Sequence, residues 1–158
     1  AGAGEIGHTV ISVDGGHRCV DDLGSEAAIF RKCQEAMLAG RLPELKILMK
    51  QDGQLCMEKI LEVQEQGNAE VNSIIENAIE FLGIALANVV NLINPGYVVV
   101  DSYLFETEKN REKLLESAKR NFFGLNEEEV QIVFTAFEKY CGAKGAAYFL
   151  LREQFLNI

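Results

Sequence analysis

Residues 68–96, NAEVNSIIENAIEFLGIALANVVNLINPG, carry the strongest periodic pattern in this sequence. Apolar side chains recur every three or four positions, which predicts one long helix over residues 68–94 with one face in a core. Asn68 has the side-chain oxygen of a good N-cap, and Pro95 ends the helix because it lacks a backbone N–H. The positions off the apolar face are polar before Phe81 and apolar or small after it. We therefore expect the helix to enter from the surface and to end buried.

Weaker patterns around this helix predict the rest of a single α/β domain over residues 1–158. Strands are expected at residues 9–13, 97–100 and 130–134, and further helices at residues 25–39, 43–50, 55–66, 106–121 and 143–155. Residues 97–100, YVVV, are continuously apolar, which is typical of a central strand covered on both faces. Residues 127–129 could alternatively open a helix in place of the third strand. About three strands with helices between them make the α/β class.

Composition argues against several classes of protein. The net charge of -9 disfavours direct binding of this chain to DNA or RNA phosphates, and 48% hydrophobic residues suffice for a core. We expect no membrane span, because Asn88, Asn91 and Asn94 interrupt the best apolar run. Four cysteines without a CxxC pair suggest reduced thiols in a cytoplasmic protein. No basic n-region of a signal peptide is present, and a start at Ala1 suggests a piece of a longer polypeptide.

Two places near the ends of predicted strands carry polar side chains that could do chemistry. Glu5 and His8, three residues apart, could hold sugar hydroxyls, act as acid and base, or bind a metal. Alternatively, His8 could simply cap a loop. Asp101 and Ser102 follow the predicted central strand, where α/β sheets usually bind ligands, although a solvated loop is the simpler interpretation.

A metal site is the other possibility at the start of the chain. Cys19 could share a metal with His8, but tetrahedral zinc needs four ligands, or three and a water. The other candidates, His17, Asp14 and Asp22 among them, have no regular spacing. The residues alone therefore do not define a zinc site.

The sequence Gly4-Glu5-Ile6-Gly7-His8 resembles a motif of the ROK family, a group of bacterial sugar-responsive repressors and sugar kinases. Residues 82–95 are similar to the family's long helix leading to a proline and a core strand, and residues 142–147 to its closing Gly-Ala-Ala segment. The resemblance covers nearly the whole chain as the C-terminal half of a family member. It implies the C-terminal lobe of an actin-like, or ribonuclease H-like, ATPase fold.

The same resemblance implies a sugar site. In the family the motif Glu and His, here Glu5 and His8, contact sugar hydroxyls, and the His also ligates zinc with three cysteines of a Cys-x-Cys-Gly-x-x-Gly-Cys-Leu-Glu stretch. The last Glu of that stretch touches the sugar. This chain has only Cys19 there, so the zinc set of His8 and Cys19 is incomplete, and no other cofactor is expected. Cys19-Val20-Asp21 matches Cys-Leu-Glu, which makes Asp21 the third sugar contact, with Glu26 as the alternative.

The family contains both regulators and kinases, and the resemblance favours a regulator. Family kinases follow the core strand with a glycine pair near the nucleotide, whereas this chain has Asp101 and Ser102, and a carboxylate repels phosphate. The long segment at residues 39–68 also resembles the regulators. We predict a non-enzymatic C-terminal domain of a transcriptional regulator of carbohydrate metabolism that binds a sugar or sugar phosphate. It would form a dimer or tetramer and reach DNA only through an upstream domain.

Two alternatives remain at this point. One is the C-terminal half of a kinase for a hexose or N-acetylhexosamine, with Glu5 and His8 placing the sugar hydroxyl for attack on ATP. The other is a degenerate paralogue that keeps the fold and binds no ligand.

Overall fold

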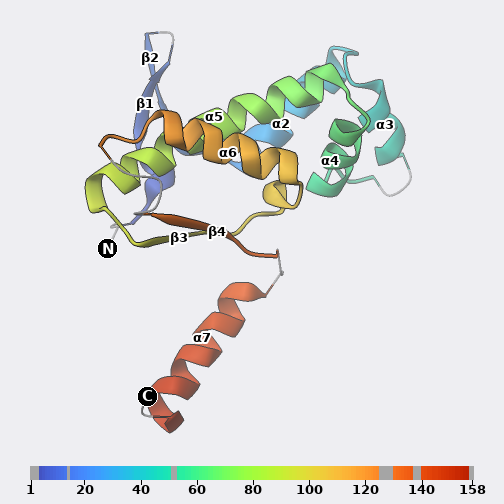
Figure 1. Cartoon of the computed structure of the whole chain (residues 1–158). Coiled ribbons are helices and arrows are strands. Elements are labelled where there is room, and N and C mark those ends of the chain that lie inside the picture. The colour runs from blue at the N-terminus through green and yellow to red at the C-terminus, as the bar shows by residue number, and fades with distance from the viewer. Residues whose placement is uncertain (1–3, 14, 51–52, 125–129, 137–139, 157–158) are drawn as a thin grey trace.

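A computed structural model describes residues 4–13, 15–50, 53–124, 130–136 and 140–156. The helices are η1 (Ile6–His8), α1 (Val20–Gly24), α2 (Glu26–Leu38), α3 (Pro43–Met49), α4 (Met57–Glu65), α5 (Ala69–Ile93), η2 (Tyr103–Phe105), α6 (Glu108–Arg120), α7 (Cys141–Leu151) and the π-helical turn η3 (Arg152–Leu156). The strands are β1 (Val10–Val13), β2 (Gly16–Cys19), β3 (Tyr97–Val100) and β4 (Gln131–Phe134). Figure 1 shows this mixed α/β arrangement with α5 running through its middle.

Helix α5 has the limits that its sequence predicts. The side-chain oxygen of Asn68 accepts hydrogen bonds from the backbone N–H groups of Glu70 and Val71, at 3.0 and 3.1 Å. At the other end, Asn94 closes the helix in the left-handed conformation, with φ of 49°. The apolar face is buried from Val71 to Val90. The predicted central helix is therefore confirmed. The expectation that it enters from the surface and ends buried is wrong, because Val71 near its start is fully buried while Leu92 and Ile93 in its last turn are 85% and 66% exposed.

Helix α5 is the surface on which the other helices pack. Helices α1, α2, α4 and α6 all contact it, with α6 alongside (Figure 1). Ion pairs join its outer side to neighbours, including Arg120 with Glu80 at 2.6 Å and Arg41 with Glu70. By length and composition alone α5 could cross a membrane, contrary to the expectation from its asparagines, but 50% of the apolar window is buried inside the structure. Such burial is also found in the core helix of a globular protein.

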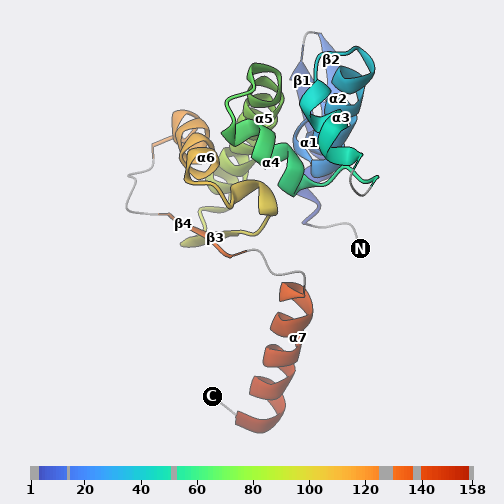
Figure 2. The same ribbon diagram turned by 90° about the vertical axis from the view of Figure 1, so that its right-hand side faces the viewer.

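The strands differ from the prediction in number and in burial. Two two-stranded sheets are described, a parallel pair β3–β4 and an antiparallel hairpin β1–β2 whose second strand was not predicted. The prediction that residues 97–100 form a strand covered on both faces is wrong for the structure as described. Val98 and Val100 are half-buried, but Tyr97 and Val99 are 68% and 63% exposed. Helices α5 and α6 cover one face of β3, and no described element covers the other (Figure 2).

The remaining predicted elements are all present within a few residues of their predicted limits. Ser25 caps α2, Pro43 opens α3, and Thr107 caps α6. Helix α7 extends away from the rest of the molecule (Figures 1 and 2), and its side chains from Tyr148 to Leu151 are exposed. Within the part of the chain that the structure describes, α7, the outer face of β3 and the groove described below are apolar and lack cover.

Cys33 gives a test of the core. It is fully buried on α2, and burial, followed by the nearby Glu70 carboxylate, raises the pKa of its thiol from 9.0 to about 11. At pH 8 we expect a disulfide reagent to leave Cys33 unmodified in the native protein and to react with it after unfolding. Because the thiol pKa is higher in the folded protein than in the unfolded one, the neutral Cys33 thiol favours the folded state. Its contribution to stability is complete below the unfolded pKa of 9.0 and is lost as pH rises toward 11.

A Cys33→Ser variant supplies the control for this measurement. In the native state the variant should react with the same number of reagent equivalents per chain as the wild type. After unfolding in urea it should react with one equivalent less per chain. Rapid modification of Cys33 in the native wild type would contradict the burial of α2 against α5.

Candidate functional site

The motif at residues 4–8 forms a tight turn that presents Glu5 and His8 to solvent. Gly4 adopts a φ of 94°, and the backbone N–H groups of Ile6 and His8 donate to the carbonyls of Gly4 and Glu5, at 3.0 and 3.2 Å. Glu5 is the N-cap of the 3-10 helix η1 and His8 is its last residue, so the two are separated by about one turn. Both Glu5 and His8 are exposed. The turn therefore offers a carboxylate and an imidazole from one short segment.

Helix α1 brings Asp21 to this turn. The backbone N–H of Val20 donates to the carbonyl of Thr9 at 3.0 Å, which fixes the start of α1 beside the end of η1. A Cβ atom added at Gly7 would clash with the carboxylate of Asp21. The carboxylate of Asp21 thus lies directly over the backbone of Gly7, which stands between Glu5 and His8 in the sequence. Only glycine at position 7 allows this approach.

The alternative residue, Glu26, lies elsewhere. It is the first residue of α2, and its Oε1 accepts a hydrogen bond from the Ser102 hydroxyl at 3.3 Å. Glu26 therefore lies at the carboxyl end of β3. Of the two matches left open by the sequence, Asp21 lies against Gly7 of the motif, whereas Glu26 bonds to Ser102.

The described residues do not provide a full set of zinc ligands. Among the described residues, no three His, Cys, Asp or Glu side chains are arranged to hold a metal ion. Cys19 is the N-cap of α1, and its backbone N–H donates to Asp22 Oδ2 at 3.3 Å. Asp14 lies outside the described residues. The donor set of His8 and Cys19 does not fit a structural zinc, which takes four protein ligands.

A second polar cluster lies at the carboxyl ends of β3 and β4. The Thr135 hydroxyl donates to Asp101 Oδ1 at 2.6 Å, and the backbone N–H of Thr135 donates to the carbonyl of Val100 at 3.1 Å. The Ser102 hydroxyl, besides donating to Glu26, accepts from the backbone N–H of Leu104 at 3.2 Å. Two carboxylates, Asp101 and Glu26, are thus held near one strand end. Sequence reasoning identified Asp101 and Ser102 here but missed Thr135, whose only signal is its position after β4.

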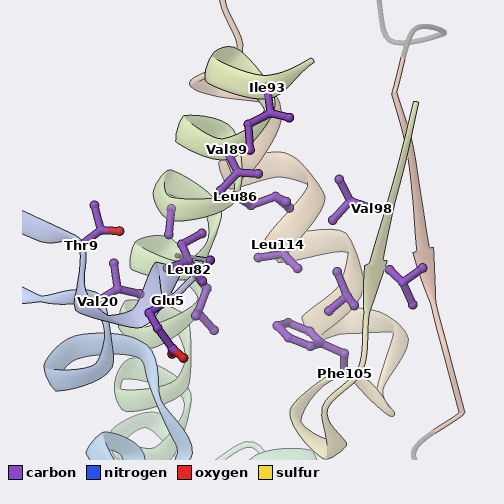
Figure 3. Close-up of a pocket in the computed structure, with 15 residues that line it drawn as sticks. Glu5, Thr9, Val20, Leu82, Leu86, Val89, Ile93, Val98, Phe105 and Leu114 are labelled. Atoms are coloured by element: carbon purple, nitrogen blue, oxygen red, sulfur yellow. The ribbon is translucent and has the colours of Figure 1, made fainter. Parts of the chain in front are cut away.

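One hollow of the described surface is lined mostly by apolar side chains. Figure 3 shows this groove, about 610 Å³ in volume, between the second half of α5 and β3. Its walls are aliphatic and aromatic side chains that include Leu82, Leu86, Val89, Ile93, Val98 and Phe105. Glu5 and Thr9 stand at its edge. A sugar site needs several converging polar groups, so this groove itself is a poor sugar site, but it borders the turn that carries Glu5.

Comparison with known proteins agrees with this architecture. The model of the ROK family matches residues 1–153. The chain belongs to the ROK family. A glucokinase of Halalkalibacterium halodurans is 25% identical over 127 residues, and a xylose repressor of Caldicellulosiruptor bescii is 27% identical over 128 residues. These alignments cover 76% and 77% of the ROK chain but only 38% and 32% of the two relatives, so the chain spans well under half of their length.

Solved structures give the same result for the fold. A ROK hexokinase from Thermus thermophilus superposes with a TM-score of 0.68 at 20% identity, over 96% of the ROK chain and 49% of the hexokinase. A ROK family transcriptional regulator, a homologue of the E. coli MLC protein, gives a TM-score of 0.73 at 21% identity, over 92% and 37%. Both classes appear among the relatives and among the structures. Family membership is therefore clear, and the choice between regulator and kinase has to come from the site.

Proposed function

We propose that this ROK chain is the C-terminal lobe of a transcriptional regulator of carbohydrate metabolism, in which it binds a sugar effector and contributes to oligomerisation. The observation that carries the proposal is that the Asp21 carboxylate lies against Gly7, inside the motif that carries Glu5 and His8. Carboxylates accept hydrogen bonds from sugar hydroxyls, and an imidazole can donate or accept one. The three side chains are exposed, as a ligand requires.

The strand-end cluster supports a regulator over a kinase. In an α/β sheet a nucleotide would approach the carboxyl ends of the parallel strands, where this chain has Asp101 and Glu26. Two carboxylates repel the phosphates of ATP unless a cation lies between them. The xylose repressor relative agrees with this assignment, and the glucokinase relative keeps the kinase as the alternative.

The regulator would work by a difference in affinity. A sugar shifts a regulator between conformations only as far as it binds one of them better than the other. DNA contacts would come from another part of the polypeptide, since this chain has a net charge of -9. A dimer or tetramer is part of the proposal, as it is what the family resemblance implies.

The first test compares the two histidines of the chain in the full-length protein. We expect one of D-xylose, D-glucose or N-acetyl-D-glucosamine at millimolar concentration to raise the melting temperature, because a ligand selective for the native state stabilises it. His8→Ala should weaken that binding about tenfold or more, the effect of losing a hydrogen bond to the ligand, without lowering the melting temperature of the free protein. His17→Ala, an exposed histidine on β2, is the matched control and should bind like the wild type.

The outcomes separate the three hypotheses, which are a regulator, a kinase and a paralogue that binds no ligand. Formation of ADP from ATP in the presence of any of these sugars would make the protein a kinase. Absence of any sugar-dependent shift over a broader panel would favour a paralogue that has lost its ligand. Equal loss of binding in the two histidine variants would remove His8 from the site.

A further inference from the structure

The carboxylate of Asp21 is directed by the backbone of α1 and not by partners of its own. Within the described residues it accepts no hydrogen bond from another side chain or from the backbone, and Asp21 is exposed. Its place over Gly7 therefore depends on where α1 is held. A helix of one and a half turns has little stability of its own, so tertiary contacts must hold it.

The inner side of α1 is held by packing. Val20 and Leu23 are buried, and a Cβ atom added at Gly24 would lie 2.9 Å from Leu82 Cγ and 3.2 Å from the carbonyl oxygen of Ala78. Helix α1 therefore rests against α5 with no space for an additional atom at Gly24. This contact fixes the height of α1 above α5 but leaves its outer carbonyls to be satisfied.

Helix α2 supplies the donors for those carbonyls. The Ser25 hydroxyl donates to the carbonyl oxygen of Asp21 at 2.6 Å and also accepts from the backbone N–H of Ala28 at 3.1 Å. Arg31 Nη2 donates to the carbonyl oxygen of Asp22 at 2.8 Å. One hydroxyl thus ends α1, starts α2 and holds the peptide group of Asp21 itself. Arg31 holds the next peptide group from one face of α2.

We propose that Ser25 is a positioning residue for the sugar site, because its hydroxyl holds the Asp21 peptide so that the Asp21 carboxylate lies over Gly7. The proposal rests on the sugar-binding function proposed above. It assigns to Ser25 a role beyond capping α2, for which any cap residue would serve. Loss of the hydroxyl should let the Asp21 turn rotate and move the carboxylate away from Glu5 and His8.

The test separates positioning from capping. In the full-length protein, Ser25→Ala should raise the dissociation constant for the sugar that binds by about fivefold, the effect of one hydrogen bond. Asn68→Ala removes the cap of α5. It should lower the melting temperature about as much as Ser25→Ala does, because each variant loses one helix cap, but it should leave the dissociation constant for the sugar unchanged. Ser25→Thr keeps the hydroxyl and should bind like the wild type.

A double-variant cycle then asks whether Ser25 acts through Asp21. Asp21→Asn alone should weaken binding, and adding Ser25→Ala to it should cause less than about a twofold further loss. An equal loss in both backgrounds, or normal affinity in Ser25→Ala, would overturn the proposal. Normal affinity in Asp21→Asn would also overturn it, while the His8→Ala result would still decide whether a sugar site exists.

A spectroscopic readout keeps the test independent of any sugar. Because Asp21 lies over Gly7, Asp21→Asn should shift the backbone amide resonance of Gly7 in an NMR spectrum. The shift should be clearly smaller when Ser25 is alanine and unchanged when Asn68 is alanine. The same Gly7 shift in the presence and absence of the Ser25 hydroxyl would show that Ser25 does not place Asp21, whether or not a sugar binds.

Discussion

Replacing Asn110 with leucine is expected to lower the free energy of unfolding by about 3 kcal/mol, as breaking a buried hydrogen-bond network does. Asn110 on α6 and Gln64 on α4 are 1% and 4% exposed. Their amides bond to each other in both directions, with Gln64 Nε2 donating to Asn110 Oδ1 at 2.9 Å and Asn110 Nδ2 donating to Gln64 Oε1 at 3.1 Å. Asn110 Nδ2 also donates to the Leu104 carbonyl at 2.9 Å. Leucine would leave both polar atoms of the Gln64 amide buried without these bonds.

The double variant Gln64→Leu/Asn110→Leu is the informative comparison, measured by urea unfolding. Removing both amides leaves only the Leu104 carbonyl without its donor, so the double variant should be less destabilised than the sum of the single ones. Strict additivity would mean that the two amides do not interact. Asn77→Leu, on the exposed face of α5, should cost little, because the Asn77 side chain bonds only within its own helix.

Helices α2 to α7 were predictable because their signals are local, whereas the short α1 was not predicted. The periodic face of α5, the caps at Asn68, Ser25 and Thr107, and the proline that opens α3 are local properties of the sequence. Their limits came out within a few residues of the structure. Local patterns decide an element when its stabilising contacts repeat along it.

The sheets were less predictable for a physical reason. Burial of a strand depends on which other segments cover it, and a continuous apolar run does not say whether those segments are present. The run at β3 therefore predicted a strand correctly and its burial wrongly, since Tyr97 and Val99 face outward without cover. Strand β2, GHRC, has too few apolar residues to be recognised alone and exists by pairing with β1.

All three candidate residues were named from the sequence, but on different grounds. Glu5 and His8 stand in one short motif, whereas Asp21 was named only through the family resemblance, because its approach to Gly7 depends on α1, which no residue pattern predicted. Ser25 and Thr135 act through hydrogen bonds to Asp21 and Asp101, and Asp101 lies 34 positions from Thr135 in the sequence. No residue pattern predicts such a hydrogen bond, because serine and threonine occur in many loops.

The turn at η1 borders two surfaces of opposite chemistry. On one side Glu5, His8 and Asp21 offer groups that bind hydroxyls, and on the other Gly4, Glu5 and Ile6 line the apolar groove beside α5. Such a groove, next to the uncovered face of β3, presents apolar area that water solvates poorly. A group that covers the groove would therefore touch the same turn that carries the proposed sugar contacts.

Two glycines on helices give the last prediction, since the same substitution should have opposite effects at them. Gly83 on α5 faces α6, and an added Cβ would clash with the Ser117 side chain, which is fully buried. Gly83→Ala should therefore lower the free energy of unfolding by about 2 kcal/mol, because overpacking outweighs the better helix propensity of alanine. At Gly145 on the exposed α7 an added Cβ meets nothing within 4 Å, so Gly145→Ala should raise helix stability by about 0.5–1 kcal/mol.

Urea unfolding measures the loss of stability in Gly83→Ala, and the helical signal in circular dichroism measures the gain in helix stability in Gly145→Ala. The pair Gly83→Ala/Ser117→Gly moves the missing side chain from one helix to the other and should recover part of the loss, because space is restored at the same contact. A Gly83→Ala variant as stable as the wild type would show that α5 and α6 can separate without cost. The close packing of these two helices, on which β3 and the groove wall depend, would then have to be reconsidered.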